Sequence, residues 1–347
     1  MAAPMWLGLI VSNHRKLRGN TMFWMSPFHR PCAAGAIALA LCFTLVTSAP
    51  AQTTVTYVGP ASGPEAVWSD PDNWSTGVVP VNDGGALFNV IIPSGHTVTF
   101  DLEDASAITG FSLDGGQVIM PDGHQLDVTG LAMIAGLINA QGTNTQFTAL
   151  GPFVAFDPGA RLWASDGAHV AVASPSLTWT SSNSAVLLQA DGVGSVLELT
   201  SLNSLAATSS GVATRNYDVQ AVNGGFIDLS NVTAVTGAGG SRWLRLLVRE
   251  ESDIDFSSLR NMQGNVSLTF DVPEYTLPAL EATEGSGSRH FQIPDGGTLN
   301  LPSLVTAVNT HLDIADGGTV NAPDLVDCSI LPVETFAFRR NRFSRFL

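Results

Sequence analysis

The chain has 347 residues, with 30 acidic residues against 15 Lys and Arg, and a formal net charge of -15 at pH 7. All the acidic residues lie after residue 51, where eleven Arg and no Lys are found, so that part carries a net charge of about -19. A charge of this sign disfavours electrostatic binding to DNA, RNA or anionic membranes. We therefore expect no nucleic-acid partner.

The N-terminus has the pattern of an export signal. Residues 33–46 are apolar and uncharged but too short to span a bilayer comfortably, and His29-Arg30 precede them. Ala49-Pro50-Ala51 gives a small-x-small cleavage pattern. We predict a signal peptide over residues 1–51, with Met25 as the favoured start, and no transmembrane anchor after cleavage.

Cleavage there leaves Cys328 as the single cysteine of the exported chain. A secreted protein without disulfides must be stabilised by its core and its backbone hydrogen bonds, which argues against a disulfide-stapled animal domain. We expect a bacterial protein that is secreted or lies at the cell surface.

A turn-rich segment with two tryptophans follows the signal. Trp68 and Trp74 lie six residues apart, and two short strands are then predicted on either side of Pro93-Ser94-Gly95. The terminal turn of a repeat protein exposes sheet edges that must be covered. We predict that residues 52–109 form an N-terminal β cap.

This segment resembles the opening of many large secreted bacterial parallel β-helix proteins and, loosely, the G8-type domain. The resemblance covers about residues 57–120 and implies a cap on a secreted solenoid; it carries over no catalytic residue, because that family is mostly uncharacterised. The matching positions, in order, are Trp68, Asn73-Trp74, Gly77, Pro80, Val90-Ile91-Ile92, Gly95 and residues 98–101.

A six-residue phrase, apolar-x-apolar-x-x-apolar, recurs through the C-terminal half. Its third residues are separated by steps of 30, 27, 21, 24 and 21. A period in this range is typical of solenoids, whose units bury their apolar faces only by stacking on one another. The copies occupy residues 197–202, 227–232, 254–259, 275–280, 299–304 and 320–325.

Each phrase follows a second alternating stretch and, in most copies, a glycine corner. Asp191-Gly192, Asn223-Gly224, Asp295-Gly296 and Asp316-Gly317 supply the positive φ that a tight corner needs. Alternation of period two places one set of side chains inside and the other in solvent. The repeat unit is therefore predicted to contain two strands and two corners.

The spacing favours an all-β fold. Apolar residues at helical spacing are missing, and so is the Asn ladder of leucine-rich repeats, whereas a parallel β-helix tolerates corners of variable length. We predict a right-handed parallel β-helix over residues 110–327. Its expected interior column is formed by Leu199, Leu229, Phe256, Leu277, Leu301 and Ala322.

Residues 328–347 differ in composition from everything before them, with four Arg in the last nine residues. We expect an atypical basic tail without ordered structure. It is interpreted either as a docking segment or, preferably, as the product of a truncation or frameshift.

The strongest candidate ligand site is a basic aromatic patch comprising Arg242, Trp243, Arg245 and Arg249. Arg beside Trp on a solvent face can recognise an acidic sugar, although pairing of these Arg with Glu250, Glu251 or acids of a neighbouring turn is the favoured interpretation. Trp163 and Trp179 are further candidates for sugar stacking.

Metal ligands are sparse in the sequence. Asp253 and Asp255 are weak candidates for structural calcium, and no other cofactor is expected. His290 and His311 begin equivalent strands of adjacent turns, so their side chains are expected to stack, either as a solvent-facing ladder, which is favoured, or as metal ligands.

Two functions remain open. The favoured one is a non-enzymatic extracellular scaffold or adhesin that presents its repeated faces to a glycan or another cell-surface component. The alternative is a polysaccharide lyase or glycoside hydrolase of the β-helix type. Its residues would lie around Arg242, Arg245, Asp253 and Asp255, although lysine, Gly-His-Gly and Asp-Asp are all missing from the exported part.

Overall fold

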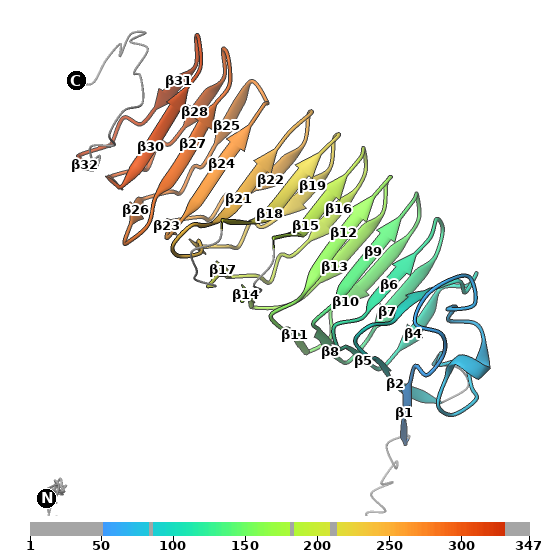
Figure 1. Cartoon of the computed structure of the whole chain (residues 1–347). Coiled ribbons are helices and arrows are strands. Elements are labelled where there is room, and N and C mark those ends of the chain that lie inside the picture. The colour runs from blue at the N-terminus through green and yellow to red at the C-terminus, as the bar shows by residue number, and fades with distance from the viewer. Residues whose placement is uncertain (1–50, 83–85, 181–183, 209–213, 330–347) are drawn as a thin grey trace, which may run out of the picture. The chain divides into compact units, whose positions relative to one another are not determined.

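The computed structural model describes residues 51–82, 86–180, 184–208 and 214–329. The predicted signal peptide and the tail from residue 330 onward lie outside the described residues. All described residues belong to one compact unit, which begins at Ala49. Within it, parallel strands stack into a β-solenoid of about ten turns, coloured from blue to red in Figure 1.

Each turn contains three strands, because from β2 onward a strand pairs in parallel with the third strand after it. The pairing is interrupted only between β11 and β14 and between β22 and β25 among the strands described. The predicted two-strand unit was therefore wrong. The strand that the prediction missed follows the six-residue phrase; it is short and rich in small residues, as in Ser204–Ala207, and gives only a weak alternating signal.

The first face of the solenoid is divided into two sheets. The five-stranded sheet contains β1 (Gln52–Thr56), β2 (Leu87–Ile92), β5 (Gly110–Leu113), β8 (Leu131–Ile134) and β11 (Phe153–Phe156). The later seven-stranded sheet contains β14 (Ser176–Trp179), β17 (Ser204–Ala207), β20 (Ala234–Thr236), β23 (Asn261–Gln263), β26 (Ala282–Glu284), β29 (Thr306–Val308) and β32 (Asp327–Ser329).

The second face is one unbroken ten-stranded sheet. It contains β3 (Thr97–Thr99), β6 (Gln117–Met120), β9 (Leu137–Gln141), β12 (Arg161–Ser165), β15 (Ala185–Asp191), β18 (Arg215–Val222), β21 (Arg242–Val248), β24 (Val266–Phe270), β27 (Arg289–Ile293) and β30 (Thr310–Ile314).

The third face again has two sheets. The early seven-stranded sheet contains β4 (Ser106–Ile108), β7 (Gln125–Val128), β10 (Gln146–Ala149), β13 (His169–Val172), β16 (Val196–Glu198), β19 (Phe226–Asp228) and β22 (Asp253–Asp255). The three-stranded sheet contains β25 (Glu274–Thr276), β28 (Thr298–Asn300) and β31 (Thr319–Asn321).

The predicted interior column lies just after the strands of this third face. Leu199, Leu229, Phe256, Leu277 and Leu301 are at most 2% exposed, whereas Ala322 in the last described turn is only half-buried. Hydrogen bonds along the ladders connect equivalent positions of successive turns, for example from Leu199 N to Asp228 O and from Leu277 N to Asn300 O.

The corners explain the glycine pattern. Gly192, Gly224, Gly296 and Gly317 all have φ between 67° and 94°, a region that glycine enters without steric cost. The corner after β21 carries no glycine, and Glu250 and Glu251 adopt φ of 55° and 62° instead. Sequence inspection therefore misses that corner.

The predicted boundary at residue 110 does not mark a change in architecture. β1 pairs with β2, Trp68 N donates to Thr99 O in β3, and Asn82 N donates to Ala107 O in β4. Residues 52–82 therefore form an irregular first turn, which extends the hydrogen-bonded ladder of each face by one segment. At the other end, residues 328–329 belong to β32, so the expected unstructured tail cannot begin at residue 328.

The first turn is held by an aromatic cluster and one buried amide. The rings of Trp68 and Trp74 have centroids 4.8 Å apart, and Trp74 Nε1 donates to Trp68 O over 2.7 Å. Between them in sequence lies η1 (Pro71–Asn73), whose Asn73 side chain donates to Glu65 O and Val67 O. Asn73 therefore ties η1 to the segment directly before Trp68.

A buried arginine closes a corner near the C-terminal end of the stack. Arg289 is fully buried, and its guanidinium donates to the carbonyl oxygens of Gly285, Gly287 and Val308. Burial lowers the pKa of its guanidinium, with Glu284 acting in the opposite direction. This basic residue therefore serves the fold rather than a ligand.

We predict that Leu277→Asp unfolds the stack, because an unpaired charge in the interior costs several kcal/mol, on the order of the whole stability of a domain. Thermal unfolding followed by circular dichroism measures the effect. Thr276→Asp places the same charge on the neighbouring exposed residue and should leave the midpoint nearly unchanged. Equal losses in both variants would contradict the interior assignment.

We also predict that Asn73→Ala destabilises the protein by about 1–3 kcal/mol, because it removes a buried amide that donates to two partly buried carbonyl groups. Urea unfolding gives the free energy directly. Asn89→Ala, which removes an exposed amide bonded to Gln52, is the matched control and should have less than half of that effect.

Candidate ligand-binding face

The outer surface of the ten-stranded sheet gathers most of the candidate residues. In-register pairing places Asp218, Arg245, Ser267, His290 and His311 at equivalent positions of five successive strands, from β18 to β30. Neighbouring parallel strands lie about 4.8 Å apart, so each of these side chains lies beside the equivalent one of the next turn. They form one column, parallel to the solenoid axis.

Two rings of this column, His290 and His311, and the ring of Trp243, which lies two residues before Arg245 on β21, form a row that we call the aromatic strip. The Trp243 and His290 ring centroids are 4.6 Å apart with planes at 70°, and the His290 and His311 centroids are also 4.6 Å apart with planes at 48°. Ser267 occupies the intervening strand, and its small side chain leaves space for the indole. All three rings are half-buried and open to solvent on one side.

The environment of His290 disfavours its charged form. Burial lowers its pKa, the charge of neighbouring His311 lowers it further, and Asp313 acts in the opposite direction. The His290 imidazole therefore tends to be neutral at neutral pH, which leaves a ring nitrogen lone pair available to accept a hydrogen bond.

The predicted basic patch is not a cluster of free cations. Arg245 donates two hydrogen bonds to the carboxylate of Asp218 on the preceding turn, at 2.7 and 2.5 Å. This pairing raises the pKa of Arg245 against the opposing effect of burial. Arg242 is buried and donates to the Tyr217 hydroxyl, whereas Arg249 is exposed just beyond the end of β21.

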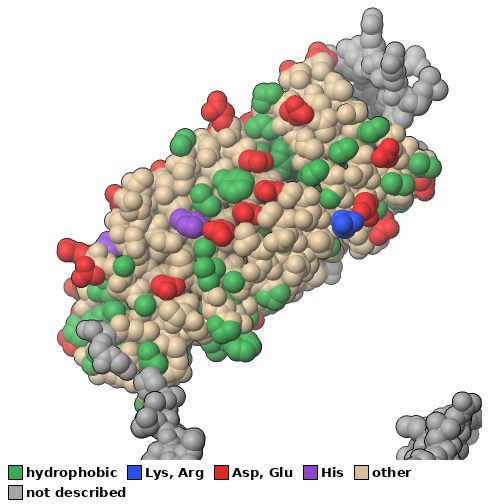
Figure 2. Space-filling model, turned by 180° about the vertical axis from the view of Figure 1, so that it is seen from behind, with side chains coloured by type: hydrophobic (Ala, Val, Ile, Leu, Met, Phe, Trp, Pro, Cys, Tyr) green, Lys and Arg blue, Asp and Glu red, His purple; other side chains and the backbone are tan. Residues whose placement is uncertain are grey.

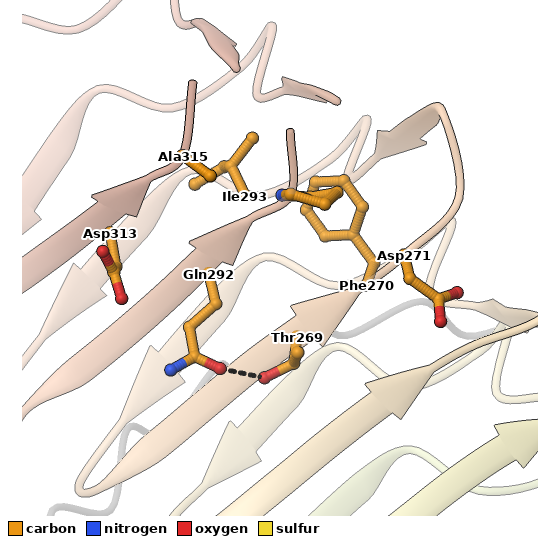
Figure 3. A pocket seen from close by; sticks show the side chains of 8 residues that line it. Thr269, Phe270, Asp271, Gln292, Ile293, Asp313 and Ala315 are labelled. Atoms are coloured by element: carbon orange, nitrogen blue, oxygen red, sulfur yellow. Dashed lines mark hydrogen bonds between the residues drawn. The ribbon is translucent and has the colours of Figure 1, made fainter. Parts of the chain in front are cut away.

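A shallow hollow lies beside the strip, where the ten-stranded sheet meets its next corner (Figure 3). Thr269 Oγ1 donates to Gln292 Oε1 over 2.7 Å on its floor, and the carboxylates of Asp271 and Asp313 flank it. Phe270 and Ile293 form its apolar wall. The hollow thus combines hydrogen-bonding groups with an apolar surface.

The calcium candidates lie on a different face. Asp253 and Asp255 belong to β22 of the early seven-stranded sheet, and Asp255 accepts a hydrogen bond from Ser257 N in a local turn. Burial raises the pKa of Asp253, and the neighbouring Asp255 raises it further. No group of three or more His, Cys, Asp or Glu side chains arranged to hold a metal ion was found among the residues that the structure describes.

The residues named for the enzymatic alternative are therefore not brought together. Arg245 points out from the ten-stranded sheet and is bonded to Asp218, Arg242 is buried, and the two aspartates lie on the third face. The two candidate tryptophans also lie in different environments. Trp179 is buried and donates to Ala160 O, while Trp163 is half-buried on the ten-stranded sheet and donates to Val186 O.

Sequence reasoning missed Asp218, Gln292 and Asp313, which become neighbours of the predicted residues only through the register. Aligning β18, β21, β27 and β30 position by position would have found them. These strands are recognisable in the sequence, but a search along the chain for runs of candidate residues does not compare outward positions from one turn to the next.

Comparison with known proteins adds no assignment. No protein-family model, curated protein or solved structure matches the chain. The structure supports one part of the resemblance to secreted β-helix proteins, namely the parallel β-solenoid fold. Among the described residues, no helix is long and apolar enough to cross a membrane.

The pKa of His290 predicts a pH-dependent stability. Its folded value lies below the ordinary 6.5, so its contribution is complete above about pH 6.5 and declines as the pH falls below that value. The thermal midpoint should decrease more in the wild type than in His290→Gln between about pH 7.5 and about pH 5.5. His96→Gln, which removes an imidazole near the first turn, should retain the wild-type decrease. An identical decrease in the wild type and His290→Gln would contradict the assignment.

Proposed function

We propose that the protein is a non-enzymatic, exported scaffold whose ten-stranded sheet binds a glycan along the aromatic strip. The single observation that carries this proposal is the strip itself: three half-buried rings in a row on a solvent face. Sugar rings offer apolar C–H faces, and half-exposed aromatic side chains provide a flat apolar partner at little conformational cost.

The neighbouring groups suit hydroxyl recognition. Gln292 and Thr269 present amide and hydroxyl groups beside the strip, and Asp313 adds a carboxylate acceptor on the last described strand of this sheet. Such groups fix the orientation of a ligand, while the rings supply most of the contact area. The site is a long, shallow face rather than a deep cavity, as expected for a polymer that lies across several turns.

The charges favour a neutral glycan over an acidic one. Arg245, the cation at the centre of the column, is already paired with Asp218, so its charge is largely neutralised. The chain is strongly acidic, and on the side of the molecule turned away from the viewer in Figure 1 acidic side chains outnumber basic ones (Figure 2). An acidic polysaccharide would have to overcome this repulsion.

Export supports an extracellular ligand and rests on the sequence alone. The run from Ala33 to Val46 and the cleavage pattern that follows it fit a signal peptide. We propose that the mature protein begins at Gln52 and acts outside the cell or at its surface, with a glycan or a glycan-bearing surface as its partner.

Binding to a panel of neutral and acidic polysaccharides, measured by affinity electrophoresis or a glycan array, tests this proposal. We expect binding to a neutral glycan that falls at least about tenfold in Trp243→Ala, because a stacked aromatic contributes about 1–3 kcal/mol. Phe153→Ala is the control, since Phe153 is 70% exposed on the five-stranded sheet. Equal losses in both variants, or no binding to any glycan, would refute the proposal.

Incubation of acidic polysaccharides with the protein tests the enzymatic alternative. The scaffold proposal expects no new reducing or unsaturated ends. If such ends form, and are lost in Arg245→Ala but retained in a variant of a remote arginine such as Arg260→Ala, the protein is a lyase or hydrolase and the proposal is wrong.

A further inference from the structure

Within the aromatic strip, the His290 and His311 pair differs from Trp243, because imidazole nitrogens can bind a metal ion as well as pack against a sugar. Both imidazoles project from adjacent, in-register strands of the ten-stranded sheet, on the same solvent-exposed surface. The ring centroids are 4.6 Å apart, and the planes are tilted by 48° rather than parallel. The parallel ladder prevents the two residues from separating by more than one strand spacing.

This geometry matches the span of one metal ion. A transition metal binds imidazole nitrogen at about 2.1 Å, so two nitrogens that share one ion lie at most about 4.2 Å apart. The centroid separation is only slightly larger, and each nitrogen lies on the perimeter of its ring. Rotation about the bond between Cβ and the ring therefore brings one nitrogen of each imidazole within this span.

The charged groups around the pair suit a bound cation. Asp313 lies two residues after His311 on the same surface and acts electrostatically on His290. Arg245, the cation of this column, is paired with Asp218, so its repulsion of a cation is reduced.

We propose that His290 and His311 form a binding site for a divalent transition-metal ion, Zn²⁺ or Cu²⁺, with two protein nitrogens and the remaining positions open to solvent. Imidazole nitrogen selects these ions over Ca²⁺ and Mg²⁺, which prefer oxygen. Asp313 contributes negative charge next to the ion. This site is independent of the glycan proposal, because it needs only the two histidines.

Isothermal titration of the full chain with ZnCl₂ and with CuCl₂ tests the proposal. We expect one binding site. Its affinity should be at least about tenfold lower in His290→Gln and, as a separate variant, in His311→Gln, because loss of a ligand removes half of the protein donors. His96→Gln and His124→Gln are the matched controls and should retain the wild-type affinity. CaCl₂ should not compete.

Trp243 gives a second readout that needs no histidine variant. Its ring lies 4.6 Å from His290, so bound Cu²⁺ should quench its fluorescence at the same concentrations that saturate the calorimetric site. The quenching should be lost in Trp243→Phe and should weaken as protons compete for the imidazoles at lower pH. Undiminished affinity in His290→Gln or His311→Gln, or saturation without quenching, would overturn the proposal.

Discussion

The hydrogen-bonded register between successive turns is the constraint on which the rest of the structure depends. Each strand pairs with the third strand after it, so an outward side chain is fixed beside the equivalent side chain of the next turn. The chain therefore builds surface features as columns parallel to the axis. The aromatic strip, the pairing of Arg245 with Asp218 and the two stacked histidines are all consequences of that register.

The same constraint explains which parts of the fold the sequence predicts. Residues inside the stack repeat because each must be apolar, and this is why Leu199, Leu229 and Leu277 reveal the solenoid. The Asp-Gly and Asn-Gly corners are visible because only a few residues accept a positive φ. The strand that follows the six-residue phrase in each turn is not evident from the sequence. Such strands are short, as in Ala234–Thr236, and small residues without strong alternation can form them.

Surface partners are harder to predict, because they depend on the register across turns of unequal length. Trp243 and His290 are 47 positions apart in the chain, yet their rings are in contact. The contact also crosses the intervening strand β24, so it follows from the side-chain geometry and not from the strand alignment alone. The basic patch was recognised as a run of sequence, but alternation sends Arg242 inward and Arg245 outward.

The ten-stranded sheet is the only face among the described strands that forms one sheet from the first turns to the last, with a single register shift between β15 and β18. On the other two faces the strand pairing is missing between β11 and β14 and between β22 and β25. A polymer that contacts several turns is best served by one continuous sheet. The continuity of this sheet, together with the aromatic strip and the hydrogen-bonding groups beside it, makes it the face best suited to an extended ligand.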